Sequence, residues 1–260
     1  MSRNVYAVYF SPTGNSEKSA ISIANEFGEK VNKIDLTVVK NEIEKKEFGI
    51  GDLVIFSAPV YGGKILKEAK ERFKKAVHGD ATPCIIVATY GNRHYDNALM
   101  EMSDLAISLG FVPVGYAALV GRHTFGEIEV NRPSVSDFEE NKAFAVKVKE
   151  KLDHYDFSIP VIPGDPEYEK IEKGGTGGKF RPLTDKASCV DCKMCASNCP
   201  MQAIDYDDVS KINNDLCISC FRCIRNCPTG AKNMNEENYI NFAKDFTAKL
   251  AVSRPNEYFF

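Results

Sequence analysis

The sequence predicts an α/β protein in which a doubly wound, five-stranded parallel sheet is followed by a small α+β domain rich in cysteine. Short apolar segments alternate with amphipathic segments over residues 1–153, as in parallel sheets whose strands are joined by crossover helices. Several apolar segments are continuously hydrophobic, which is typical of strands buried on both faces. Eight of the nine cysteines lie between residues 189 and 227, a crowding that indicates metal ligation rather than disulfides.

The five strands are predicted from short runs of aliphatic, β-branched and aromatic residues. In chain order they span residues 5–10, 33–38, 52–57, 83–89 and 111–120. The third and fourth contain the runs Leu-Val-Ile-Phe and Ile-Ile-Val, which fit strands covered on both faces. Five such strands predict the order 2-1-3-4-5, and a ligand then binds at their carboxyl ends, between the first and the third strand.

Helices are predicted from apolar residues that recur at a spacing of three or four. Between and after the strands they span residues 17–27, 65–77, 96–109 and 134–152. The first of them places Ile23 and Phe27 on one face. A last helix, 236–250, carries Phe242 and Phe246 four residues apart, and we expect it to pack against one of the two domains.

Composition excludes several classes of protein. The 260 residues are 43% hydrophobic and 27% charged, which fits a globular chain and not a disordered, collagenous or coiled-coil one. The formal net charge is −3, so the chain lacks the positive charge expected of a nucleic-acid binder. The longest apolar stretches, such as residues 84–88, are far shorter than the roughly 20 residues that cross a bilayer, and no signal-peptide pattern is present. We therefore expect a cytoplasmic protein with no membrane span and no nucleic-acid partner.

Two domains and a long linker are expected. Residues 1–153 form the α/β domain, 186–235 the cysteine-rich domain, and 236–260 a C-terminal helix and tail. The linker, 154–185, contains four prolines and a glycine-rich run at 174–178, and segments of this length without periodicity are linkers or functional loops. Because the linker also carries apolar residues, we expect most of it to be ordered on the surface, with only residues 174–178 mobile.

The cysteine-rich segment contains the motif C-x2-C-x2-C-x3-C-P twice. The first copy comprises Cys189, Cys192, Cys195 and Cys199, and the second Cys217, Cys220, Cys223 and Cys227. This spacing is that of bacterial iron–sulfur proteins with two clusters, in which the fourth cysteine of each run ligates the other cluster. By this rule Cys227 completes the first [4Fe–4S] cluster and Cys199 the second. Two zinc sites are the alternative, although zinc motifs usually pair cysteines two by two across a longer gap.

This segment resembles the bacterial two-cluster ferredoxins across residues 186–235. The resemblance covers all eight cysteines, the prolines that follow Cys199 and Cys227, and the small or turn residues after them. It implies that the domain transfers single electrons between two clusters. The ninth cysteine, Cys84, lies within a predicted strand, where a buried cysteine acts as a small hydrophobic residue.

Three loops follow the first, third and fourth predicted strands and contain the candidate ligand-binding residues. These are Ser11, Thr13, Gly14, Asn15 and Ser16; Ala58, Pro59, Val60, Tyr61, Gly62 and Gly63; and Thr89, Tyr90, Gly91, Asn92 and Tyr95. The first loop opens a helix, so its free N–H groups and hydroxyls can bind a phosphate. It contains no Lys or Arg, which favours a phosphate monoester held by neutral donors; an ordinary helix N-cap is the alternative. In the other two loops, Tyr61 and Tyr90 are expected to flank a flat ring.

With these three loops, the first 150 residues resemble flavodoxins. The resemblance implies an FMN whose phosphate lies in the loop 11–16 and whose isoalloxazine ring lies at the two later loops. The chain contains no Trp, so the tryptophan that often stacks on the flavin in that family is absent. As a whole, the chain is similar to the flavodoxin–ferredoxin fusion proteins labelled EFR1-family ferredoxins, which implies FMN, two [4Fe–4S] clusters and electron transfer within the chain.

We expect an electron-transfer flavoprotein of the oxidoreductase type that couples one-electron and two-electron redox protein partners. One alternative is an FMN-dependent reductase of a small organic acceptor, fed by its own ferredoxin domain. Another is a ferredoxin whose flavodoxin-like domain lacks FMN and serves for docking. No G-x-G-x-x-G motif follows a strand, so direct NAD(P)H binding is not predicted, and no catalytic residue is assigned. The electron donor and acceptor, and whether the chain forms a homodimer, stay open.

Overall fold

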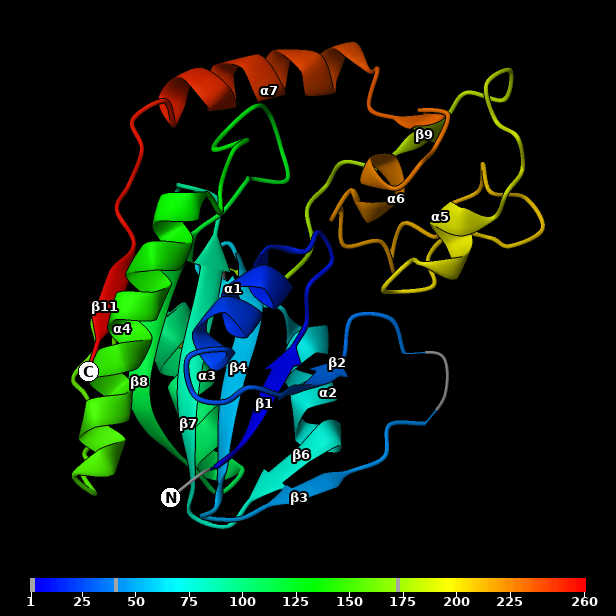
Figure 1. Ribbon diagram of the computed structural model, residues 1–260. Helices are drawn as coiled ribbons and strands as arrows, with labels where there is room; N and C mark the ends of the chain where they lie inside the picture. Colours follow the sequence, from blue (N-terminus) through cyan, green and yellow to red (C-terminus); the bar gives the residue numbers. More distant parts are fainter. Residues whose placement is uncertain (1–2, 40–41, 172–173) are drawn as a thin grey trace.

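The computed structural model describes residues 3–39, 42–171 and 174–260, and its centre is a seven-stranded sheet (Figure 1). Five parallel strands take the predicted order, β2-β1-β4-β7-β8. They span β1 Asn4–Tyr9, β2 Val31–Asp35, β4 Asp52–Tyr61, β7 Thr82–Tyr90 and β8 Phe111–Val120. The predicted α/β class and strand order are therefore confirmed.

Helices cover both faces of this sheet. They are α1 Asn15–Ala24, α2 Lys67–Ala76, α3 Ala98–Ser108 and α4 Val135–Asp153. Alternate residues of each strand face opposite sides, so Val8 packs with the residues of α2 and α3, while Ala7 packs with those of α1 and α4. Both clusters of side chains are buried, which explains why the central strands are apolar throughout.

Several short elements were not predicted from the sequence. The hairpin strand β5, Lys64–Ile65, pairs with the end of β4, and β3, Lys46–Phe48, pairs with β6, Val77–Gly79. The strand β11, Glu257–Phe259, is formed by the C-terminal tail and runs antiparallel to β8 at the edge of the sheet. Strands of two or three residues carry too little periodicity to be recognised in a sequence.

The cysteine-rich domain is built from two similar halves. Each motif leads into a four-residue helix, α5 Met194–Ser197 and α6 Arg222–Arg225. In both halves the residue before the helix has a positive φ, 59° at Lys193 and 58° at Phe221. The ladder of β9, Leu183–Thr184, and β10, Lys232–Asn233, joins the two ends of the domain. The repeat in the sequence is thus also a repeat in the backbone.

The linker lies against the α/β domain, and its glycine-rich run, which we expected to be mobile, makes close contacts there. A 3-10 helix, η1 Tyr168–Lys170, buries Tyr168, whose hydroxyl donates to Asp104. The amide of Gly175 donates to the carbonyl of Tyr61 over 2.7 Å. Gly174 has a φ of 94°, and a Cβ at this position would lie 2.4 Å from the carbonyl oxygen of Gly62. Glycine is required here both because of this positive φ and because two backbones meet.

The C-terminal segment bridges the two domains. Helix α7, Glu237–Lys249, starts at the cysteine-rich domain and passes over the α/β domain, and the tail then returns along β8 (Figure 1). Its aromatic residues join a cluster of rings that includes Phe125 of the α/β domain and Phe221 of the cysteine-rich domain. Asn92 anchors the tail by donating to the carbonyls of Leu250 and Val252. Of the described helices, none is long and apolar enough to cross a membrane.

Candidate functional site

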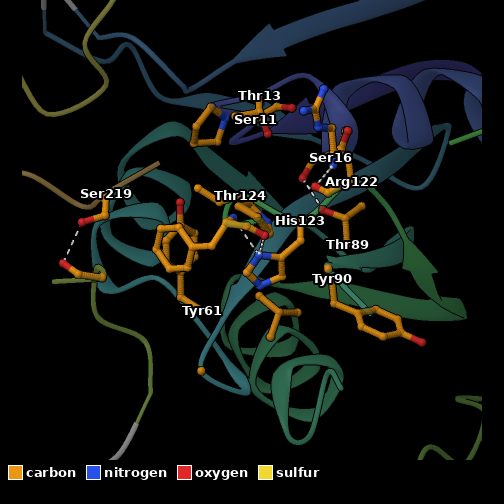
Figure 2. Close-up of a pocket in the computed structure, with 18 of the residues that line it drawn as sticks. Ser11, Thr13, Ser16, Tyr61, Thr89, Tyr90, Arg122, His123, Thr124 and Ser219 are labelled. Atoms are coloured by element: carbon orange, nitrogen blue, oxygen red, sulfur yellow. Dashed lines mark hydrogen bonds between the residues drawn. The ribbon is translucent and has the colours of Figure 1, made fainter. Parts of the chain in front are cut away.

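A cavity of about 300 Å³ lies at the carboxyl ends of β1, β4, β7 and β8, the edge at which the sequence predicts a ligand (Figure 2). Its size falls within the range of roughly 300–1,000 Å³ that is usual for small-molecule sites. Eleven of the predicted residues line it, namely Ser11, Thr13, Asn15, Ser16, Pro59, Val60, Tyr61, Gly62, Thr89, Tyr90 and Gly91. The three predicted loops therefore converge, because the carboxyl ends of parallel strands share one edge of the sheet.

The loop after β1 presents backbone donors at the first turn of α1. The amides of Thr13, Asn15 and Ser16 have no acceptor within the described part of the chain. Two of the side chains are already used: Ser11 accepts from the amide of Glu17, and the hydroxyl of Ser16 pairs with that of Thr89 at 2.6 Å. Unpaired amides and the positive end of a helix dipole can bind an anion, so the chemistry of this loop fits the phosphate that the sequence predicts.

Arginine also reaches this cavity, from a loop that the sequence analysis did not select. Arg122 follows β8 and lines the cavity next to Ser16 (Figure 2). Its carbonyl accepts from the side chain of Asn15, and its buried Nε has no partner among the described residues. The expectation of purely neutral donors was drawn from one loop, whereas the loop after β8 brings a guanidinium to the same edge. Its Nη2 pairs with Glu127 at 3.5 Å, and its unpaired Nε leaves it able to donate to an anionic ligand as well.

The two tyrosines differ in their surroundings. Tyr61 points toward the cavity, and burial, together with Cys220 and Cys217 nearby, raises the pKa of its hydroxyl well above the usual value. Tyr90 points away from the cavity: its ring packs on Tyr95, and its hydroxyl donates to the carbonyl of Pro255. Successive residues of a strand face opposite sides, so Thr89 faces the cavity and Tyr90 does not. The structure thus offers one of the two expected tyrosine rings to a ligand.

Five further predicted residues do not line the cavity: Gly14, Ala58, Gly63, Asn92 and Tyr95. Ala58 lies in the core, and Gly63 packs against Asp96. Asn92 and Tyr95 bind the C-terminal tail, Tyr95 through a hydroxyl that donates to Glu257 over 2.8 Å. Sequence reasoning could not separate Asn92 and Tyr95 from the cavity lining, because the tail that they bind comes from the other end of the chain.

His123 lines the cavity and lies against Gly91, where a Cβ would be 2.1 Å from the imidazole Cδ2. Burial lowers the pKa of His123 from 6.5 to about 4. Its Nδ1 lies 2.8 Å from the amide nitrogen of Phe125 and 3.0 Å from the carbonyl oxygen of the same residue, so either tautomer of the ring finds a partner there. The site therefore contains a neutral imidazole at ordinary pH.

This burial predicts a pH-dependent stability. Because the pKa of His123 is depressed in the folded state, its contribution is complete above about pH 6.5 and is lost as the pH falls toward 4. We expect the free energy of unfolding to fall by about 2 kcal/mol between pH 7.5 and pH 5, measured by anaerobic denaturant unfolding. His123→Gln should flatten this dependence, whereas the control His94→Gln, at a half-exposed histidine, should retain it. An unchanged pH dependence in His123→Gln would contradict the prediction.

The cysteine-rich domain and the linker complete the wall of the cavity. Thr176, Gly178 and Ser219 all line it, and Ser219 lies between Cys217 and Cys220 in the chain. Arg222 donates to the carbonyl of Pro12, at 2.7 Å, and so fastens the loop after β1 to the cysteine-rich domain. No signal in the sequence points to these residues, since only the folded chain brings them to the sheet.

The eight cysteines line two small cavities. Cys189, Cys192, Cys195 and Cys227 surround one, and Cys199, Cys217, Cys220 and Cys223 the other. In neither group, nor elsewhere in the described chain, are three His, Cys, Asp or Glu side chains arranged to ligate one metal ion. Burial raises the pKa of Cys220 and Cys223 to about 12, so these thiols need a bound cation to become thiolates.

Comparison with known families gives a match within this domain. Residues 188–231 match the family described as 4Fe-4S dicluster domain. This part of the chain is similar to such domains. It is joined in one chain to a flavodoxin-like domain, whose strand order the sheet itself displays. Comparison with curated protein sequences gives no match.

Several solved structures are similar to the flavodoxin-like part. A flavodoxin from the domain Archaea is 15% identical, with 58% of this chain and 99% of that chain covered and a TM-score of 0.39. The flavodoxin of Streptococcus pneumoniae TIGR4 is 18% identical, with 56% and 98% covered and a TM-score of 0.39. The Flv1 flavodiiron core of Synechocystis sp. PCC6803 is 14% identical, with 59% and 37% covered and a TM-score of 0.42.

Proposed function

We propose that this protein transfers electrons between two [4Fe–4S] clusters in its dicluster domain and an FMN in its flavodoxin-like domain, and that it couples one-electron to two-electron redox partners. The observation that carries the proposal is the shared wall of the cavity. The loop that holds Cys217 and Cys220 also supplies Ser219 to the lining of the flavodoxin-like site. A cluster-binding loop and a candidate flavin site are thus in direct contact.

The residues present fit the two kinds of cofactor. Cys189, Cys192, Cys195 and Cys227 would hold the first cluster, and Cys217, Cys220, Cys223 and Cys199 the second. The amides of Thr13, Asn15 and Ser16, with Arg122, would hold the phosphate of FMN. Tyr61 would lie against its ring, and the neutral imidazole of His123 would lie at its polar edge. A flavin accepts one or two electrons and a cluster only one, which is the chemistry that such a pair supplies.

The chain holds its two domains in one arrangement. Arg222 bonds to Pro12, and Arg225 donates to the carbonyl of His123 over 2.9 Å. Three rings pack around Phe125, which lines the cavity: Phe180 of the linker, Phe221, which precedes α6, and Phe242 of α7. These contacts keep Tyr61 next to the cysteines of the second motif. They support transfer along a fixed path and not by collision between loosely tethered domains.

Two measurements test the proposal. Protein isolated without oxygen should contain about eight iron atoms, from two cubane clusters, and one FMN per chain. After rapid photoreduction of the clusters, the flavin should bleach at a rate that does not depend on protein concentration. Zinc in place of iron would contradict the proposed clusters. Iron without flavin would contradict the proposed FMN. A rate that rises linearly with concentration would contradict the fixed path.

A further inference from the structure

Lys232 is a buried lysine to which the proposed function gives no role. It lies on β10, its side chain is fully enclosed at 2% exposure, and its Nζ donates to the carbonyl of Val209 over 2.6 Å. No carboxylate pairs with it in the part of the chain that the structure describes. A buried ammonium with a single neutral partner is costly, so this position requires a compensating negative charge.

The surroundings of Lys232 indicate where that charge comes from. Lys232 lines the small cavity that Cys189, Cys192, Cys195 and Cys227 surround, and its own amide donates to the Sγ of Cys227 over 3.4 Å. Lys232 also lies near the second group of cysteines. Val209, which accepts the hydrogen bond of the ammonium, belongs to a buried apolar cluster against which Cys199 and Cys223 pack. One buried cation therefore lies near both sets of cysteines.

We propose that the buried ammonium of Lys232 raises the reduction potentials of both iron–sulfur clusters. The inference rests on the clusters of the proposed function, though not on its FMN. A cluster held by four thiolates has a net negative charge, and the electron that it accepts adds one more. A fixed positive charge inside the protein stabilises this more negative form, and net charge and solvent exposure are among the factors that set cluster potentials.

Burial makes this effect large and local. Charges at the surface are screened by water and salt, whereas a buried charge is screened much less. Lys211 provides a matched comparison in the same domain, because its side chain is 72% exposed and pairs with Asp208 at the surface. The same loss of one positive charge at Lys211 should therefore have little effect on either cluster.

The test is an anaerobic redox titration of the full protein, followed by electron paramagnetic resonance. In Lys232→Gln, which keeps an N–H donor for Val209 and loses the charge, we expect the equilibrium constant for one-electron reduction of each cluster to fall about tenfold, a shift of about 59 mV to lower potential. Lys211→Gln should change it less than about twofold, and Lys232→Arg should stay near the wild type. Potentials unchanged in an iron-loaded Lys232→Gln would overturn the inference.

If a variant fails to bind its clusters, the iron content of the variants still tests the inference. Loss of iron from Lys232→Gln but not from Lys232→Arg would support the inference, because cluster assembly would then require the positive charge at this position. Loss from both variants would overturn the inference, since packing alone would explain it. Wild-type protein without iron would contradict the clusters themselves, whereas wild-type protein with iron and no flavin would contradict only the flavin part of the proposed function.

Discussion

Cys199→Ser is expected to abolish the second cluster, although Cys199 belongs to the first motif. Cys199 lines the same cavity as Cys217, Cys220 and Cys223, and the other cavity contains Cys227 in its place. A serine oxygen is a harder ligand than a thiolate and a poorer match for iron–sulfur clusters. We therefore expect iron to fall from about eight atoms per chain to about four, measured after anaerobic reconstitution.

The identity of the lost cluster can be read from matched variants. The paramagnetic resonance spectrum of reduced Cys199→Ser should match that of Cys217→Ser and differ from that of Cys189→Ser. Cys84→Ala is the control, because Cys84 is buried in β7 and lines neither of the two cysteine cavities, and it should retain all the iron. A Cys199→Ser spectrum that matched Cys189→Ser would show that each motif binds its own cluster.

Riboflavin is expected to bind at least 100-fold more weakly than FMN. The phosphate would accept from the amides of Thr13, Asn15 and Ser16 and from Arg122, and hydrogen bonds to charged groups contribute about 1.5–3 kcal/mol each. Loss of even two of them costs two or more decades of affinity. The measurement is a flavin fluorescence titration of protein from which the flavin, but not the iron, has been removed.

A variant at Arg122 distinguishes the loss of one phosphate contact from a general disturbance of the cavity. Arg122→Gln should weaken FMN binding about tenfold, the loss of one charged hydrogen bond, and leave riboflavin binding unchanged. Arg93→Gln is the control, because Arg93 also follows a strand at this edge of the sheet and pairs with a carboxylate, Asp96, but is not among the residues that line the cavity. Equal affinity for riboflavin and FMN in the wild type would remove the loop after β1 from the site.

Regular elements were predictable because their signals are local. The predicted strand at 111–120 coincides with β8, and the predicted helix at 134–152 differs from α4 by one residue at each end. Ser134 caps that helix together with Asp137, a start signal carried by adjacent residues. The third predicted strand was too short, since β4 continues to Tyr61, and Ala58 to Tyr61 are strand residues rather than loop residues. The run of apolar residues ends before the backbone pairing of β4 ends.

Candidate site residues were predictable to the extent that they follow a strand. The rule that ligands bind at the carboxyl ends of parallel strands selected Ser16 and Tyr61, both of which line the cavity. Applied to the fifth strand, the same rule would also have selected Arg122 and His123. It could not have shown that the Tyr90 side chain turns toward the tail, because that depends on a partner, Pro255, far along the chain.

By itself, the sequence determined the class of each domain, the strand order and the grouping of eight cysteines into two motifs, because hydrophobic periodicity and motif spacing are local properties of the chain. Only the tertiary structure decided how the domains meet. It placed Ser219 in the wall of the cavity, bonded Arg222 to the loop after β1 and enclosed Lys232 between the cysteines. These contacts join residues far apart in the chain, and no local pattern records them, because they arise when separately folded surfaces pack together.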